Sequence, residues 1–199
     1  MDYYQIIAGN FQSTIETIAM SVDTLAEPIE RGSQLMTGAL LSDCKIIACG
    51  NGVDAALAQL FASNLLSRFE QERPALPALS LAGDSASLTA IAQHSGINDI
   101  FSRQLRALGN AGDILLCINS GAVASNLIRA VQAAHERNMG VILMSNSLDS
   151  ELGNLIRAED VELRIDESNQ GRTASLHSMV IHCFCELIDH SLFGAHSQD

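Results

Sequence analysis

The sequence has little positive charge, and this shortage excludes several classes of function. It contains 11 lysine and arginine residues against 23 aspartate and glutamate residues, which gives a formal net charge of −12 at pH 7. An acidic surface repels a phosphate backbone and anionic headgroups, so we expect no direct binding to nucleic acid or to a membrane. No apolar run approaches the roughly 20 residues that span a bilayer. The acidic and aromatic start of the chain is not a signal peptide. We therefore expect a cytoplasmic protein.

The cysteines support neither a disulfide framework nor a zinc knuckle. Their number, five, is odd, and no two of them form a C-x-x-C pair. Four of them lie in apolar segments, where we expect buried and reduced thiols. The five positions are Cys44, Cys49, Cys117, Cys183 and Cys185.

Apolar residues recur at helical spacing through the first 40 residues. Residues 2–26 form one predicted helix, Glu27-Pro28 interrupts the pattern, and a second predicted helix runs to about Leu41. This N-terminal helical hairpin has more apolar surface than one small sheet can cover. The surplus face is either an oligomer interface or part of the packing on the domain's own core.

From Lys45 onward, short apolar strands alternate with helices. The predicted strands are residues 46–49, 78–81, 114–118, 141–144 and 161–165, and the predicted helices are residues 54–69, 85 onward, 98–108, 124–137, 150–156 and 172–192. This order predicts a mainly parallel α/β sheet with helices on both faces. We treat residues 1–42 as oligomerisation helices and 43–199 as the sheet-containing unit of one structural domain.

Ligands of such folds bind beyond the carboxyl ends of the strands. Four polar, mostly glycine-containing turns are predicted at that edge: Gly50-Asn51-Gly52, Gly83-Asp84-Ser85, Asn119-Ser120-Gly121 and Ser145-Asn146-Ser147. The first of them lies between a strand and a helix in the stretch Lys45–Asn64. Such a unit points backbone N–H groups and a helix N-terminus at an anion.

Several motifs together resemble the sugar isomerase (SIS) domain family over nearly the whole chain. They are C-G-N-G at 49–52, R-F-E-Q-E-R-P-A-L-P-A at 68–78, F-S-R-Q-L-R-A-L-G at 101–109, A-G-D-I-L-L-C-I-N-S-G at 111–121 and C-F-C-E-L-I-D at 183–189. They are similar to the branch that holds phosphoheptose isomerases and DnaA initiator-associating proteins (DiaA-type). The resemblance implies a three-layer αβα sandwich with a five-stranded parallel sheet, and a homotetramer built partly on the N-terminal helices.

The resemblance also implies where a metal site would lie. The resemblance to phosphoheptose isomerases implies a zinc enzyme with four ligands. Two of them, a histidine and a carboxylate, lie on the helix after the first glycine turn, and a glutamine and a histidine lie on the last helix. Here the first three places hold Leu60, Asn64 and Ala174, and only the last histidine remains, as His182. Leucine and alanine cannot bind a metal. We expect no cofactor, with zinc only if the chain is an isomerase after all. His182 is either a remnant of the pocket lining or a partly buried structural histidine.

The implied phosphate site is altered in the same way. The family serine after the first glycine turn corresponds to Asp54, a sound helix N-cap whose charge repels a phosphate. In the second turn, Ser120 and Ser125 are the nearest remaining hydroxyl groups. The predicted remnant of the sugar-phosphate pocket comprises Gly50, Asn51, Gly52, Asp54, Asp84, Asn119, Ser120 and Ser125.

Three functions follow as hypotheses. The favoured one is a non-catalytic homotetramer that, like the proteins it resembles, binds the replication initiator DnaA and promotes its assembly. The alternatives are a phosphoheptose isomerase acting on sedoheptulose 7-phosphate, and a sensor that binds a sugar phosphate without converting it. Leu192 and Phe193, at the end of the last helix, either contact a partner protein or pack against a neighbouring subunit.

Overall fold

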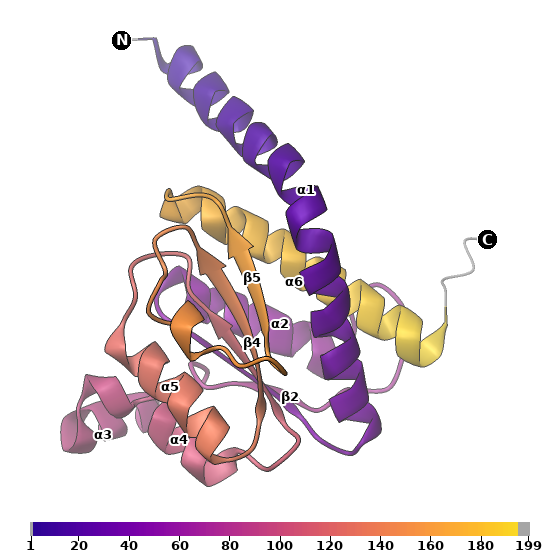
Figure 1. Cartoon of the computed structure of the whole chain (residues 1–199), viewed down its shortest axis with the longest axis vertical. Helices are drawn as coiled ribbons and strands as arrows, with labels where there is room; N and C mark the ends of the chain where they lie inside the picture. Colours follow the sequence, from indigo (N-terminus) through magenta and orange to yellow (C-terminus); the bar gives the residue numbers. More distant parts are fainter. Residues whose placement is uncertain (1, 195–199) are drawn as a thin grey trace.

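The computed structural model describes residues 2–194 and has three layers, with a parallel sheet in the middle (Figure 1). The five strands are paired in the order β2-β1-β3-β4-β5, and every pairing is parallel. Their bounds are β1 (Ile46–Gly50), β2 (Ala78–Ser80), β3 (Ile114–Ile118), β4 (Gly140–Asn146) and β5 (Val161–Ile165). The predicted α/β class and the predicted five-stranded parallel sheet are confirmed.

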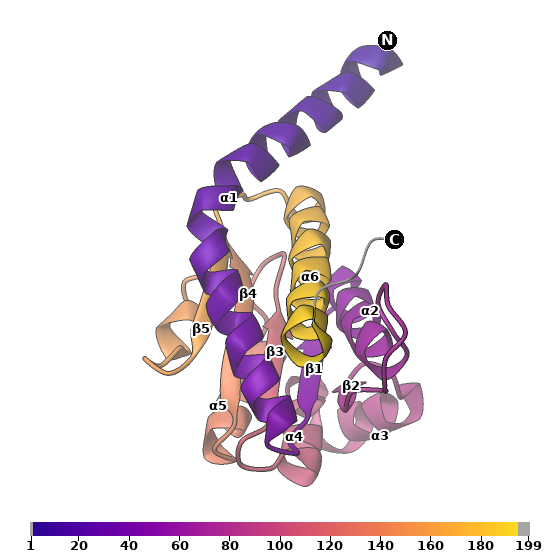
Figure 2. The same ribbon diagram turned by 90° about the vertical axis from the view of Figure 1, so that its right-hand side faces the viewer.

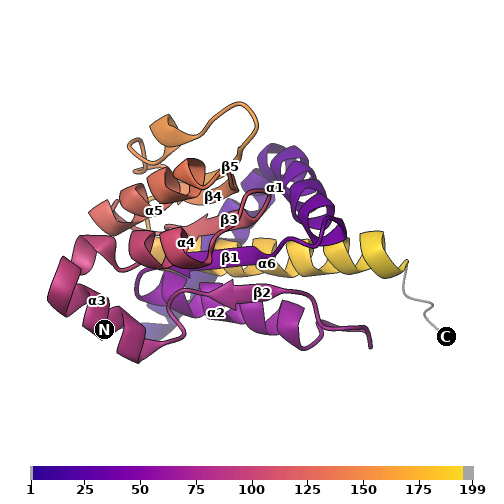
Figure 3. The ribbon, with the colours of Figure 1, turned by 90° about the horizontal axis from the view of Figure 1, so that it is seen from below.

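Helices cover both faces of this sheet (Figure 3). One face is covered by α1 (Tyr3–Leu41), α2 (Val53–Leu66) and α6 (Gln170–Phe193). The other is covered by α3 (Ser85–Ser95), α4 (Ser102–Leu108) and α5 (Ser125–Glu136). Two short 3-10 turns, η1 (Ile97–Asp99) and η2 (Gly153–Leu155), complete the fold.

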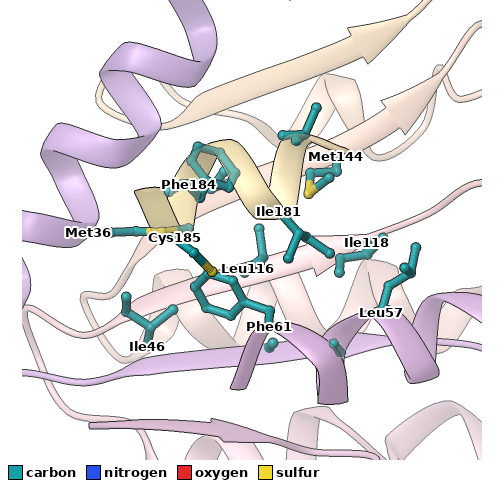
Figure 4. Close-up of a cluster of buried hydrophobic side chains, with 14 of the residues drawn as sticks. Met36, Ile46, Leu57, Phe61, Leu116, Ile118, Met144, Ile181, Phe184 and Cys185 are labelled. Atoms are coloured by element: carbon teal, nitrogen blue, oxygen red, sulfur yellow. The ribbon is translucent and has the colours of Figure 1, made fainter. Parts of the chain in front are cut away.

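The core is divided by the sheet, because successive strand side chains point to opposite faces. In β1, Ile46 packs with Phe61 of α2 and Phe184 of α6, and all three are fully buried (Figure 4). The next residue, Ile47, packs with Phe101 and the other residues of the opposite cluster. Continuous apolar strands with this double burial are typical of parallel sheets covered on both sides.

The predicted N-terminal hairpin is wrong, because the first 40 residues form the single 39-residue helix α1 with Pro28 inside it. Proline removes one helical hydrogen bond and usually kinks a helix, but it does not always end it. Leu25 and Met36 lie on either side of Pro28 and are both buried in the core cluster. This packing holds the helix together across the proline, and Figure 2 shows α1 bending along its length.

The first half of α1 extends away from the rest of the domain (Figures 1 and 2). Its large apolar side chains are exposed: the exposed fraction is 69% for Phe11 and 58% for Ile15. Farther along, α1 and α6 form an apolar groove of about 190 Å³. The groove is lined by Ile18, Ser21, Val22, Leu25, Ala26, Ile29, Leu176, Met179, Val180 and Cys183.

Within residues 2–194, no helix combines the length and the apolar character needed to cross a bilayer. All five cysteines are free, and Cys49, Cys117 and Cys185 are buried, so three of the four thiols expected in the core lie there.

Candidate functional site

The candidate site lies where β1 and β3 end side by side at the carboxyl edge of the sheet. The chain continues from β1 toward β2 on one side, and from β3 toward β4 on the other. Such a reversal of strand order opens a crevice in α/β sheets. Here the crevice lies between the turn Asn51-Gly52 after β1 and the turn Asn119-Ser120-Gly121 after β3.

Two glycines allow the first turn of α2 to approach β1 closely. A side chain at Gly50 would place its Cβ 2.6 Å from the Cβ of Asp54 and 2.7 Å from the Asp54 carbonyl, so only glycine fits. Gly52 has a positive φ of 58° and forms the N-cap of α2 without a side-chain hydrogen bond. Helix α2 therefore begins at Val53, and Asp54 is not the N-cap that the sequence predicted.

Asp54 instead points inward and joins a buried polar chain with Ser120 and His177. One carboxylate oxygen accepts the backbone N–H of Ser120 at 2.9 Å, and the other accepts its hydroxyl group at 2.5 Å. The Ser120 Oγ lies 2.9 Å from His177 Nδ1. The exposed fraction is 3% for Asp54 and zero for the other two residues.

The protonation of this chain follows from its burial. Burial raises the pKa of the Asp54 carboxyl, and the hydrogen bonds from Ser120 partly oppose the shift. Burial lowers the pKa of His177 to about 4, so its imidazole is neutral near pH 7. Because the Ser120 hydroxyl donates its single proton to Asp54, it accepts from His177 Nδ1–H. His177 Nε2 has no well-aligned hydrogen-bond partner.

Asparagine side chains tie the turns of this edge together. Asn51 and Asn126 exchange two amide hydrogen bonds of 2.9 Å, which connect the turn after β1 to α5. Asn119 donates to a carboxylate oxygen of Asp149 at 2.8 Å. The predicted residues Gly50, Asn51, Gly52, Asp54, Asn119 and Ser120 therefore lie together at the crevice.

Two other predicted pocket residues serve different purposes. Asp84 is exposed and caps α3 by accepting the N–H groups of Ala86 and Ser87 at 2.9 and 3.2 Å. Hydrogen bonds from Ser87 hold the pKa of the Asp84 carboxyl below its usual value. Ser125 is exposed at the first position of α5. Neither side chain forms a hydrogen bond with Asp54, Ser120 or His177.

The places at which the family resemblance implies zinc ligands do not fit zinc. Leu60 packs against the core cluster, and Ala174 is buried with no donor atom. Asn64 offers an uncharged amide. Among residues 2–194, no group of three histidine, cysteine or acidic side chains is arranged to hold a metal ion. The donor set is therefore lost through these substitutions.

His182 is exposed on α6, where its ring stacks on Phe69 with a centroid separation of 5.5 Å. It follows Ser178 by one helical turn and shares that face of the helix. Ser178, Val53, Gln170, Gly171, Ala174 and Ser175 line an open hollow of about 530 Å³ beside the glycine turn. The structure thus places His182 along the same helix face as the hollow and does not bury it as a structural histidine.

The two apolar residues at the end of α6, Leu192 and Phe193, differ in exposure. Phe193 is 41% exposed, as a contact residue would be. Leu192 is only half-exposed and packs against the core cluster of its own chain.

His177 is the site residue that the sequence analysis missed. His177 lies five residues before His182 and therefore on another face of α6. A usable signal was present, because Val180 and Phe184 follow it at spacings of three and seven. These spacings place His177 on the buried stripe of α6, where a polar side chain needs a partner.

Comparisons with known proteins identify the family. A family model described as the SIS domain matches residues 10–146. A phosphoheptose isomerase of Chromohalobacter salexigens is 42% identical over 195 residues, covering 98% of this chain and 99% of the relative. One of Alkalilimnicola ehrlichii is 43% identical over 194 residues, again covering 98% and 99%. The solved structure of a phosphoheptose isomerase from Francisella tularensis has a TM-score of 0.92 at 37% identity, covering 96% of this chain and 100% of that one.

These findings contradict the favoured hypothesis of a non-catalytic protein of the DnaA initiator-associating type. Curated relatives that match nearly end to end are phosphoheptose isomerases, so the alternative hypothesis has the better support. The expectation that the chain is not an enzyme is likewise unsupported. The match to the SIS family model and the full-length similarity lead to one conclusion: this chain belongs to the SIS domain family, in its phosphoheptose isomerase-like branch.

Proposed function

We propose that this chain is an aldose–ketose isomerase of the phosphoheptose isomerase type, acting on a phosphorylated sugar at the carboxyl edge of the sheet. The observation that carries this proposal is the 42% identity to a phosphoheptose isomerase over 98% of the chain. The similarity includes the glycine turn after β1 and the whole of α6, and the hollow is lined by Val53 beside that turn and by residues of the first half of α6. The hollow lies at the carboxyl edge of the sheet, where ligands of α/β folds bind.

The proposed reaction requires a group that moves a proton between neighbouring carbons. A base takes the proton from the carbon beside the carbonyl and exchanges it with water, and the same group then returns a proton to the former carbonyl carbon. A second proton passes between the two oxygens, so nothing is gained or lost overall. Histidine suits this task because its imidazole gains and loses a proton near neutral pH. We assign the transfer to His182, which is accessible on the helix face that borders the hollow.

The buried histidine cannot take this role. His177 is inaccessible to solvent, and its Nδ1 is already bonded to Ser120. Asp54 is also enclosed. Zinc does not fit the side chains at Leu60, Asn64 and Ala174, so no step of the proposed reaction passes through a metal at that place.

Turnover of sedoheptulose 7-phosphate tests the proposal. Purified protein is incubated with this ketose phosphate, with and without added zinc, and the aldose product is measured by chromatography. We expect product from the wild type and a loss of at least about 100-fold in His182→Ala, the usual contribution of a general base. His190→Ala, which removes an exposed histidine two turns farther along α6, is the matched control and should keep its activity. Absence of product under both conditions would reject the proposal.

A second candidate function is a sensor that binds a sugar phosphate without converting it. It is favoured by Leu60, Asn64 and Ala174, which stand where the family resemblance implies metal ligands and supply no metal-binding or proton-accepting group. A ligand that binds only the folded state raises the unfolding temperature. Thermal stabilisation by sedoheptulose 7-phosphate without product would support the sensor over the isomerase.

We also propose that the chain forms a homotetramer in which the exposed apolar face of α1 contacts another copy. The spacing of Ile7, Phe11 and Ile15 places them along one stripe of the helix, and all three are more than half exposed. Single exposed apolar residues are normal on a protein surface, but a continuous stripe of them is typical of an interface.

A further inference from the structure

The crevice between β1 and β3 contains donors suited to an anion, and these donors are already in use. The backbone N–H of Ser120 lies beyond the end of β3, facing the first turn of α2. Both this N–H and the Ser120 hydroxyl bind the carboxylate of Asp54. A carboxylate held at two points by one residue shows that this donor pair accepts a negatively charged group.

The position of Asp54 is built into the backbone. Gly50 leaves no room for a side chain between β1 and the first turn of α2, since the Asp54 Cβ would lie 2.6 Å from a Cβ at Gly50. On the other side, His177 bonds to the Ser120 Oγ and fixes that hydroxyl group. The carboxylate is 3% exposed, so it is held at the crevice and is not a mobile surface charge.

We propose that Asp54 is a specificity-determining residue: its carboxylate holds the anion-binding donors of Ser120 and thereby weakens binding of the phosphate group of a sugar phosphate. This inference deepens the proposed function, because it concerns the phosphate end of the same pocket. A phosphate that approached Ser120 would meet a like charge and would find both donors occupied. The sugar part of the ligand must then supply most of the affinity.

Inorganic sulfate is the probe that isolates this effect. It carries two negative charges, resembles phosphate in shape and does not change its charge between pH 5 and 8. Binding is measured by calorimetry at constant ionic strength, since salt screens charge interactions. The proteins compared are the wild type, Asp54→Asn, Asp54→Ser and the control Asp113→Asn.

The variants separate charge from occupancy. Asp54→Asn removes the charge but keeps an oxygen for the Ser120 N–H, whereas Asp54→Ser removes the charge and frees the donors. We expect a sulfate affinity about 10-fold higher than wild type for Asp54→Asn and higher still for Asp54→Ser, because a factor of ten corresponds to one pKa unit of charge interaction. Asp113 is a buried carboxylate at the opposite edge, bonded to Lys45 and to two backbone N–H groups. Asp113→Asn should lose stability and leave sulfate affinity unchanged.

The outcomes distinguish this inference from the proposed function. Equal sulfate affinity in the wild type and both Asp54 variants, or no binding by any of them, would overturn the inference even if the wild type isomerises its substrate. Tighter sulfate binding by the Asp54 variants would support the inference. If the wild type at the same time fails to convert sedoheptulose 7-phosphate, the isomerase proposal is rejected and the inference stands. If the variants do not fold, the wild type decides: a dissociation constant for sulfate below about 0.1 mM would contradict the inference, since that affinity requires available donors.

Discussion

Gly50 determines how closely α2 can begin against β1. Replacing Gly50 by alanine would force its Cβ into the backbone and Cβ of Asp54 at 2.6–2.7 Å. We expect the free energy of unfolding to fall by about 1–3 kcal/mol, the usual cost of overpacking. Gly38→Ala is the matched control, because nothing lies within 4 Å of its Cβ and it lies inside α1. That change should stabilise by about 0.5–1 kcal/mol. Urea denaturation measures both, and equal effects of the two variants would contradict the close approach.

His177 makes the stability of the fold sensitive to acid. Its pKa is 6.5 in the unfolded chain and about 4 in the fold, where burial favours the neutral ring. Stabilisation by this residue is complete above pH 6.5 and is lost as the pH falls toward 4, because the unfolded state binds the proton first. Between pH 7 and pH 4.5 this residue should account for a loss of about 2–3 kcal/mol in the free energy of unfolding.

The comparison of wild type with His177→Gln over the same pH range isolates that loss. The variant should show a pH dependence smaller by the same amount, and the exposed His94→Gln should behave as the wild type. A wild type and His177→Gln with parallel pH profiles would show that His177 is not buried in its neutral form.

Residue types alone could identify the crevice but not its internal bonds. The glycine turn and Ser120 were recognisable because small and polar residues follow apolar strands. The inward turn of Asp54 was not, since an aspartate at the start of a helix is usually a cap. Its place depends on Gly50 and Ser120, which are distant in sequence from one another and meet only in the folded sheet.

Among the elements, the strands were the most predictable and α1 the least. Strands of a doubly covered sheet are continuous apolar runs, so β3 and β5 were predicted with the bounds that the structure shows. The break predicted at Pro28 followed a local rule that tertiary packing overrides, because Leu25 and Met36 bury the helix on both sides of it. No pattern in one chain reveals that compensation.

A buried ion pair connects the loop after α2 to α6. Arg73 Nε donates to Asp189 at 2.7 Å, and its other nitrogens bind the carbonyls of Leu65 and Asn64, both at 2.8 Å. Both charged side chains are almost fully buried. Arg73→Met should lower the free energy of unfolding by about 3–5 kcal/mol, because it leaves Asp189 as a buried charge without a partner.

The exposed pair Arg68–Glu72 in the same loop supplies the control. Arg68→Met should cost less than about 1 kcal/mol, as is usual for surface ion pairs. Urea midpoints measure both variants, and a small effect of Arg73→Met would mean that Asp189 is accessible to water.

At the scale of the whole molecule, our proposal is that another copy of the chain covers the exposed apolar face of the first half of α1. Phe11→Ser combined with Ile15→Ser should dissociate the tetramer, because it removes two exposed apolar side chains from the proposed interface. Multi-angle light scattering measures the mass. Gln12→Ser, an exposed polar residue of the same helix, should leave the tetramer intact. A wild type that is monomeric at micromolar concentration would contradict the proposed assembly.

Our proposal makes the ligand a small phosphorylated sugar and not a macromolecular polyanion, which the net charge of −12 would repel. A sugar phosphate would meet the single charge of Asp54 at the crevice, whereas a nucleic acid would meet the whole acidic surface.

Deuterium exchange tests the central claim most directly, because the proposed isomerase must remove a proton from carbon before any net product forms. The wild type is incubated with sedoheptulose 7-phosphate in D₂O. Proton NMR follows the signals of the protons on C1, the carbon beside the carbonyl that becomes the aldehyde carbon. The account predicts that these signals are lost with the wild type and persist with His182→Ala. Persistence of the signals with the wild type, or equal loss with His182→Ala, would contradict it.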